Sequence, residues 1–148
     1  MYTLCNGIRF IKGFGLGYKM VRKIMLVLGR HEFRAELNDS ETSSKIWKAL
    51  PFEAAASTWG NEIYFGIPVH AALEPDASSE REIGDICYWV EGSSMCIFFG
   101  RTPASTSDRP KAAAPVNYLG RLVDIDIKAL NAIKDGDLIK ISRHGGAE

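Results

Sequence analysis

The chain has 148 residues, of which 46% are hydrophobic and 24% charged, values typical of one soluble globular domain that is long enough to bury a core. The formal net charge is zero, but residues 32–148 hold all 18 acidic residues and only 12 of the 18 basic ones. Such an acidic body argues against general nucleic-acid binding, which needs a basic surface that displaces counterions, so we expect no nucleic-acid partner.

The first 19 residues differ from the rest of the chain in charge and in glycine content. They contain no acidic residue, and Arg9 and Lys12 interrupt their apolar run. A secretory signal needs an unbroken apolar core of about 7 to 15 residues. A membrane-spanning helix needs roughly 18 apolar residues. Neither pattern occurs in the sequence, so we expect no membrane span and a cytoplasmic protein.

These features predict three parts. Residues 1–19 are a basic, disordered extension, residues 20–144 form one β-barrel domain, and residues 145–148 are a tail. Two interpretations of the extension stay open. One is a weakly amphipathic segment that lies on a membrane surface. The other, which we prefer, is a stretch upstream of a natural start at Met20 or Met25.

Residues 23–28 and 32–37 predict a first hairpin that turns at Gly29-Arg30. In its second arm apolar and polar residues alternate with a period of two, the pattern of a strand with one solvated face. Short polar residues follow and favour a helix start. We therefore expect a short helix from Ser43 to Leu50, which Pro51 ends because proline does not fit a helix interior.

Two strands are expected next, a short one at 52–57 and a longer one at 59–65. Alternation along the longer strand separates two faces. One face carries Trp59, Asn61, Ile63 and Phe65, and the other carries Glu62 and Tyr64. The polar residues 74–82 then predict a long loop.

Residues 85–90 and 95–99 are rich in aromatic and branched side chains and predict a central hairpin. Both of its faces carry large residues, so we expect it to be covered on both sides. Its two arms contain Cys87 and Cys96. A two-residue turn at Glu91-Gly92 would place these cysteines opposite each other, whereas a four-residue turn would not. We favour a pair of buried thiols over a disulfide.

A second loop at 104–114 precedes a strand at 115–124, in which Gly120 is typical of a bulge or a close approach. Asp126 caps the short helix that follows, and a final strand spans 138–142. The whole pattern is mainly β, with about eight strands and two short helices. A closed barrel capped by the helices is the economical arrangement, because closure leaves no exposed sheet edge.

Several segments, in this order along the chain, resemble the small bacterial and archaeal cyclophilin-like family. They are Leu50-Pro-Phe, Trp59-Gly-Asn-Glu-Ile-Tyr-Phe, Gly84-Asp-Ile-Cys-Tyr-Trp, Phe98-Phe-Gly-Arg-Thr-Pro-Ala-Ser, Pro115-Val-Asn and Leu119-Gly-Arg. The resemblance covers roughly residues 22–143. It implies a closed, cyclophilin-like barrel of about eight strands, and it carries no function with it because the family has no settled activity.

One group of residues is a candidate ligand-binding set. Its members are Glu62, Tyr64, Tyr88, Phe99, Arg101, Thr102 and Asn117. Glu62 and Tyr64 project from one strand face, and we expect Tyr88 and Phe99 to meet them across the sheet. The mixture of apolar floor, carboxylate, cation and hydrogen-bonding groups suits a small polar ligand or a peptide. The three cysteines and three histidines lack metal-ligand spacing, so we expect no metal and no cofactor.

A binding module is therefore the predicted function, with three alternatives. The first is a divergent peptidyl-prolyl isomerase, which needs a guanidinium near the prolyl nitrogen. The Phe-His-Arg and Gln-Gly-Gly sequences of true cyclophilins do not occur here, which leaves Arg34, Arg101 and Arg121 as donors. The second is a hydrolase or lyase in which burial raises the pKa of Glu62 toward neutrality. The third is a purely regulatory interaction.

Overall fold

The computed structural model describes residues 2–5, 8–12 and 18–144. These residues form a mainly β fold with two short helices. The strands are β1 (Tyr2–Cys5), β2 (Ile8–Lys12), β3 (Tyr18–Leu28), β4 (His31–Leu37), β5 (Phe52–Ala55), β6 (Ser57–Thr58), β7 (Glu62–Gly66), β8 (Ser78–Glu80), β9 (Asp85–Trp89), β10 (Ser94–Phe98), β11 (Lys111–Leu122) and β12 (Leu138–Arg143). The helices are α1 (Glu41–Ala49) and α2 (Ile127–Asn131). Neither helix is long and apolar enough to cross a membrane, and no other helix occurs in the described part of the chain.

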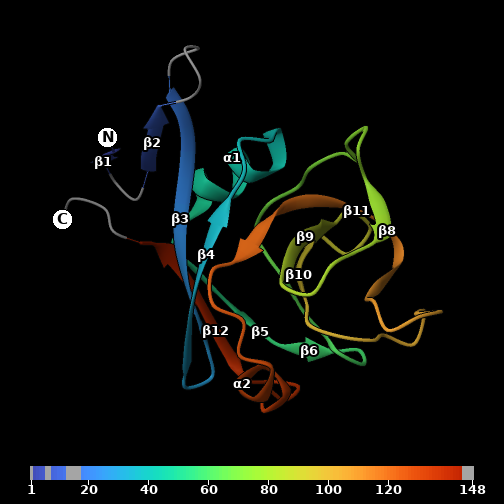
Figure 1. Ribbon diagram of the computed structural model, residues 1–148. Coiled ribbons are helices and arrows are strands. Elements are labelled where there is room, and N and C mark those ends of the chain that lie inside the picture. Colours follow the sequence, from blue (N-terminus) through green and yellow to red (C-terminus); the bar gives the residue numbers. More distant parts are fainter. Residues whose placement is uncertain (1, 6–7, 13–17, 145–148) are drawn as a thin grey trace.

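The strands form one curved antiparallel sheet in the order β1-β2-β3-β4-β11-β9-β10-β7-β6, with β12 pairing β3 and β5. In Figure 1 the sheet curls around the core, with α1 near its upper end and α2 near its lower end. The predicted barrel closed by hydrogen bonds is not confirmed. β5 pairs with β12 and β6 pairs with β7, and across the described residues no ladder joins these two pairs. The gap is bridged by the chain itself at Ala56, whose N–H donates to the Asp137 carbonyl over 2.9 Å.

The described residues of the N-terminal segment lie in strands. β1 pairs with β2, and β2 pairs with residues 18–22 of β3. The pairing of β2 with β3 has a physical reason. β4 and β12 pair only with residues 22–28 of β3, so without β2 the first part of β3 would be a free edge. The division into domains at residue 20 stays a prediction. Residues 1, 6–7, 13–17 and the predicted tail at 145–148 lie outside the described residues.

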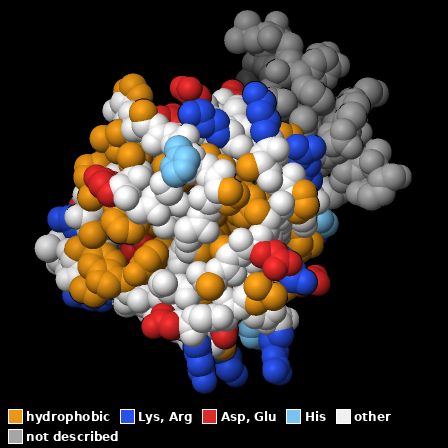
Figure 2. Space-filling view, turned by 180° about the vertical axis from the view of Figure 1, so that it is seen from behind, with side chains coloured by type: hydrophobic (Ala, Val, Ile, Leu, Met, Phe, Trp, Pro, Cys, Tyr) orange, Lys and Arg blue, Asp and Glu red, His pale blue; other side chains and the backbone are white. Residues whose placement is uncertain are grey.

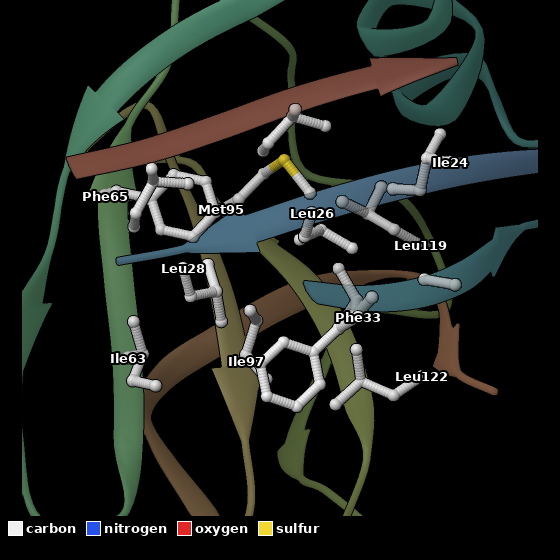
Figure 3. Packing of buried hydrophobic residues seen from close by; sticks show 14 of the residues in the cluster. Ile24, Leu26, Leu28, Phe33, Ile63, Phe65, Met95, Ile97, Leu119 and Leu122 are labelled. Carbon is white, nitrogen blue, oxygen red and sulfur yellow. The ribbon is translucent and has the colours of Figure 1, made fainter. Parts of the chain in front are cut away.

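Alternate residues of the strands point inward and form the main core. Ile24, Leu26 and Leu28 of β3 pack toward Phe33 of β4, and Figure 3 shows their contacts with side chains of β7, β10 and β11. The labelled partners from these three strands are Ile63, Phe65, Met95, Ile97, Leu119 and Leu122. All are almost fully buried, so the period-two pattern in the sequence correctly predicts which side chains face inward.

The predicted turn of the first hairpin and the predicted cap at Asp126 are confirmed, whereas α1 spans Glu41–Ala49 instead of the expected 43–50. The first hairpin turns at Gly29-Arg30, with Leu28 paired to His31. Helix α1 begins after Ser40, whose side chain accepts a hydrogen bond from the N–H of Ser43, and α2 begins after Asp126 in the same way. Each cap satisfies a backbone donor that has no partner within the helix.

Several strand and loop boundaries differ from the prediction. The strand expected at 59–65 begins at Glu62, because Trp59 and Glu62 bond to each other's backbone and close a turn. The loop expected at 74–82 contains the short strand β8. The loop expected at 104–114 ends early, because β11 begins at Lys111 and pairs irregularly with β8 before Val116.

Gly120 lies at a shift in register between β9 and β11, as its position in the sequence predicts. Its φ is +152°, and an added Cβ would lie 1.9 Å from the backbone oxygen of Glu36 in β4. A side chain at this position would therefore push β4 and β11 apart.

We predict that Gly120→Ala lowers the free energy of unfolding by about 3 kcal/mol or more, because the clash is with backbone rather than with a movable side chain. Gly66→Ala is the matched control, because nothing lies within 4 Å of a Cβ there. It should change stability by less than about 0.5 kcal/mol. Urea unfolding of both variants checks this, and equal effects would contradict the close approach.

Candidate functional site

A second apolar cluster lies on the outer face of β7, β9 and β10, opposite the main core. Its buried members are Cys87, Cys96, Phe98, Ala112 and Val116. The first half of β11, together with β8, covers this face. The central hairpin is thus buried on both sides, as its composition predicts.

A cavity of about 240 Å³ opens on this outer face. Its lining residues are Trp59, Glu62, Tyr64, Trp89, Cys96, Ala112, Ala113, Ala114 and Val116. Figure 2 shows hydrophobic side chains gathered around a hollow on the left of the view, the side to which the rotation brings β8 to β11. We call this cavity the Glu62 pocket, because Glu62 supplies its single formally charged group among the described lining residues.

Glu62 is 7% exposed and stands at the start of β7. Burial disfavours its ionised form and raises the pKa of its carboxyl to about 7, while a hydrogen bond with the Cys96 side chain acts in the opposite direction and is the weaker effect. The carboxyl is therefore partly protonated at neutral pH. It can accept a hydrogen bond or a cation when ionised, and donate a hydrogen bond when neutral.

Aromatic rings form the walls of the Glu62 pocket. The rings of Tyr64 and Trp89 meet edge to face, with centroids 6.1 Å apart and planes at 90°. The Trp89 ring also lies against Gly92 in the hairpin turn, where an added Cβ would be 2.3 Å from ring atoms. Gly92 therefore fixes the position of one wall, because only a residue without a side chain leaves room for the indole.

The structure divides the predicted ligand-binding set between the two faces of the sheet. Glu62 and Tyr64 line the pocket, but Tyr88 and Phe99 belong to the main core on the opposite face. The prediction that these two pairs meet is wrong. Tyr64 pairs with Cys96, and Cys96 pairs with Cys87, so the odd-numbered residues of β9 share the face of Glu62 and the even-numbered Tyr88 does not.

Tyr88 and Asn117 have structural contacts instead. The Tyr88 hydroxyl donates to the Val69 carbonyl over 2.7 Å. The Asn117 side chain accepts from the Glu74 N–H over 2.8 Å and donates to the Ala72 carbonyl over 2.9 Å. Both residues are fully buried, and together they hold the connection between β7 and β8 against the sheet.

Arg101 and Thr102 lie in the loop between β10 and β11, near the turn before β7. The Arg101 carbonyl accepts from the N–H of Asn61 over 2.8 Å, while its exposed guanidinium donates to the Ser107 carbonyl. Thr102 donates to the Lys111 carbonyl at the start of β11. Neither side chain lines the pocket. Thr102 instead anchors the segment that forms the alanine-rich wall.

Sequence reasoning assigned no binding role to Trp59, Trp89 or Cys96, which line the pocket. For Trp89 and Cys96, the turn at Glu91-Gly92 is the sequence signal that indicates their position. The two-residue turn predicts the observed register, in which Cys87 lies opposite Cys96 and Trp89 opposite Ser94.

The two cysteines are free and buried, as expected. Burial raises the pKa of the Cys87 thiol to about 12 and that of Cys96 well above its usual range, so neither is a ready nucleophile.

Comparison with known proteins places this architecture in a family. A family model described as cyclophilin-like matches residues 22–142. The chain belongs to the cyclophilin-like family. This cyclophilin-like chain is similar to the hypothetical protein AF2241 from Archaeoglobus fulgidus, whose solution structure matches with 33% identity and a TM-score of 0.70. That match covers 82% of this chain and 93% of AF2241.

A second solved structure shares the fold at lower similarity. It is McbB in complex with tryptophan, which is 14% identical and gives a TM-score of 0.57. The match covers 84% of the cyclophilin-like chain but 46% of McbB, so it spans less than half of that protein. No curated protein sequence matches the chain.

The raised pKa of Glu62 predicts a pH-dependent stability. The pKa of the carboxyl is about 7 in the folded chain and returns to an ordinary value of 4.5 on unfolding. Between these values the folded chain holds a proton that the unfolded chain has released. The stabilisation is therefore complete below pH 4.5 and is lost as the pH rises through 7.

We expect Glu62→Gln to remove this component. The free energy of unfolding of the variant, minus that of the wild type, should increase by about 2.5 kcal/mol between pH 5 and pH 8. Urea unfolding of both proteins across this range is the measurement, and all other titrating groups cancel in the difference. A difference that does not change with pH would mean that Glu62 ionises normally.

Proposed function

We propose that this chain is a binding module that holds a small, largely apolar molecule in the Glu62 pocket. The observation that carries the proposal is the nearly buried carboxyl of Glu62, which lines an aromatic cavity that has room for a ligand next to the carboxyl. Small-molecule sites are typically concave and apolar, with few polar groups that orient the ligand. Here Glu62 is the orienting group, and Trp59, Tyr64 and Trp89 supply apolar contact area.

The size of the cavity limits the ligand. Its volume of about 240 Å³ lies below the roughly 300 to 1,000 Å³ of typical small-molecule sites. A single ring with a short side chain fits this space, and of a peptide only one side chain would enter. Structural similarity to McbB supports the class of small ligand, because that protein is described in complex with tryptophan.

The isomerase alternative receives less support from the geometry. Arg34 is exposed and paired with Asp124, while Arg101 reaches Ser107. Arg121 donates to Asp85 over 2.8 Å. None of these three arginines lines the Glu62 pocket, so its described lining offers no guanidinium to a prolyl nitrogen. Isomerase activity stays a prediction that a direct assay of X–Pro exchange would test.

Acid–base chemistry is a second candidate function, and one observation favours it. A carboxyl whose pKa is about 7 is matched to proton transfer at neutral pH. Its hydrogen-bond partner Cys96 has a raised thiol pKa and would not serve as a nucleophile. Glu62 would then act as a general base or acid on a bound molecule. The rate of that reaction would depend on pH, with an apparent pKa near 7.

Binding can be tested with a panel of small aromatic amines, alcohols, amides and acids, in which thermal stabilisation reports binding to the folded chain. We expect at least one class to raise the melting temperature, and Trp89→Ala and Glu62→Gln to reduce that rise. Glu32→Gln is the matched control, because Glu32 is an exposed carboxylate on β4 and should leave the rise unchanged.

The result that would contradict the proposal is equally specific. If no compound stabilises the protein, or if stabilisation is the same in Trp89→Ala, then the Glu62 pocket is not the binding site. Nuclear magnetic resonance shifts of the Trp59 and Trp89 indole N–H signals would locate any binding directly.

A further inference from the structure

Glu62 is a buried acidic group without a cationic partner. Among the described residues it forms no ion pair, and its one side-chain partner is Cys96. Two basic residues in the chain between β10 and the alanine-rich wall have other partners. Lys111 lies 3.6 Å from Glu80, and Arg101 lies 3.8 Å from Asp108. Buried charges in proteins are normally paired, but none of the described residues supplies a cation to the Glu62 carboxylate.

The other groups that face Glu62 do not supply charge either. β10 contributes Cys96, β9 contributes Cys87, and β7 itself contributes Tyr64. Burial raises the pKa of both thiols, which keeps them neutral at physiological pH. The wall from β11 is made of alanine and valine. Beyond Cys87, the Arg81 guanidinium donates to the Cys87 sulfur over 3.4 Å and lies 3.8 Å from Asp85. Arg121 donates to Asp85 over 2.8 Å.

The aromatic walls favour one sign of ligand charge. The face of an aromatic ring carries negative electrostatic potential and attracts cations, most strongly for tryptophan. Three aromatic rings line the space beside the carboxyl. They are Trp59 from the turn before β7, Tyr64 from β7 and Trp89 from β9. An anion would meet both the rings and Glu62 unfavourably.

We propose that the Glu62 pocket binds an organic monocation, namely an amine with a small aromatic or aliphatic body. The ammonium group lies against the Glu62 carboxylate and among the rings of Trp59, Tyr64 and Trp89, and the body fills the space toward the alanine-rich wall of β11. This inference rests on the proposed binding function and names its ligand class.

Binding of such a cation changes the protonation of Glu62. The ammonium group pairs with the ionised carboxylate, so the proton that the free protein holds near neutral pH is released to solvent. A ligand that instead offers a hydrogen-bond acceptor, such as an amide carbonyl, pairs with the neutral carboxyl and takes up a proton. The pH dependence of affinity therefore has opposite signs for the two ligand classes.

The test uses three matched probes that share one ring and differ in charge: 2-phenylethylamine, 2-phenylethanol and 3-phenylpropanoate. Dissociation constants are measured by magnetic resonance titration of the full chain at pH 6, 7 and 8. We expect the amine to bind most tightly, with affinity increasing about tenfold from pH 6 to pH 8, as the carboxyl ionises with a pKa of about 7. The alcohol should change little, and the acid should bind most weakly.

Two variants separate the contributions of charge and ring. Glu62→Gln should weaken the amine at pH 8 at least tenfold, remove the pH dependence, and leave the alcohol nearly unchanged. Trp89→Leu should weaken the amine more than the alcohol, because only the cation gains from the ring face. Glu32→Gln is again the control. Calorimetry in two buffers of different ionisation enthalpy should show about half a proton released per amine at pH 7.

The outcomes distinguish this inference from the proposed function. If the alcohol binds as tightly as the amine, or if affinity for the amine falls as the pH rises, the ligand is not a cation, while the Glu62 pocket still binds. If only amides or acids in the wider panel bind there, the cation inference is again overturned. If nothing binds in the pocket at all, both proposals fail.

Discussion

Burial of both faces of the β9–β10 hairpin is the constraint on which the site depends. The inward residues of these strands complete the main core, and the outward residues are covered by the first half of β11. Because the outer face is covered rather than solvated, side chains there are removed from water. Glu62 at the start of β7 shares that face, and its carboxyl is the one acidic group among the described residues that line the cavity. The site is thus a consequence of a sheet with two cores.

The close approach at Gly120 makes this double coverage possible. The first part of β11 forms the outer wall and pairs with β8 between Lys111 and Val116. From Asn117 to Arg121 it pairs with β9, and from Gly120 onward it also pairs with β4 and contributes to the main core. One strand therefore serves both cores, and its bulge shifts the register between the two roles. Thr102 adds a second restraint, because its bond to the Lys111 carbonyl fixes where the outer wall begins.

Local sequence signals predicted much of the fold, and their limits are physical. The turn residues Gly29 and Gly92, the cap Asp126 and the alternation of Ile63 with Tyr64 act over a few residues, and each of these predictions agrees with the structure. The pairing of β7 with β10 joins residues about 30 positions apart, and no local pattern sets its register. A shift of one residue exchanges the two faces of a strand. For this reason the sequence alone places Tyr88, and not Trp89, beside Glu62.

The buried carboxyl of Glu62 lowers the stability of the folded chain once it ionises, and a purely structural role does not explain this. Its ionisation in the folded chain opposes stability above pH 7, because the apolar surroundings that raise its pKa also disfavour its charge. Glutamine would fill nearly the same space without that cost. A buried acid that destabilises its own fold is expected where the charge is used, since ligand binding then supplies the missing partner and recovers the lost free energy. The same argument explains why the surrounding groups are uncharged: thiols, rings and alanine leave the carboxylate available to a ligand, whereas a resident lysine or arginine would stabilise the fold and fill the site.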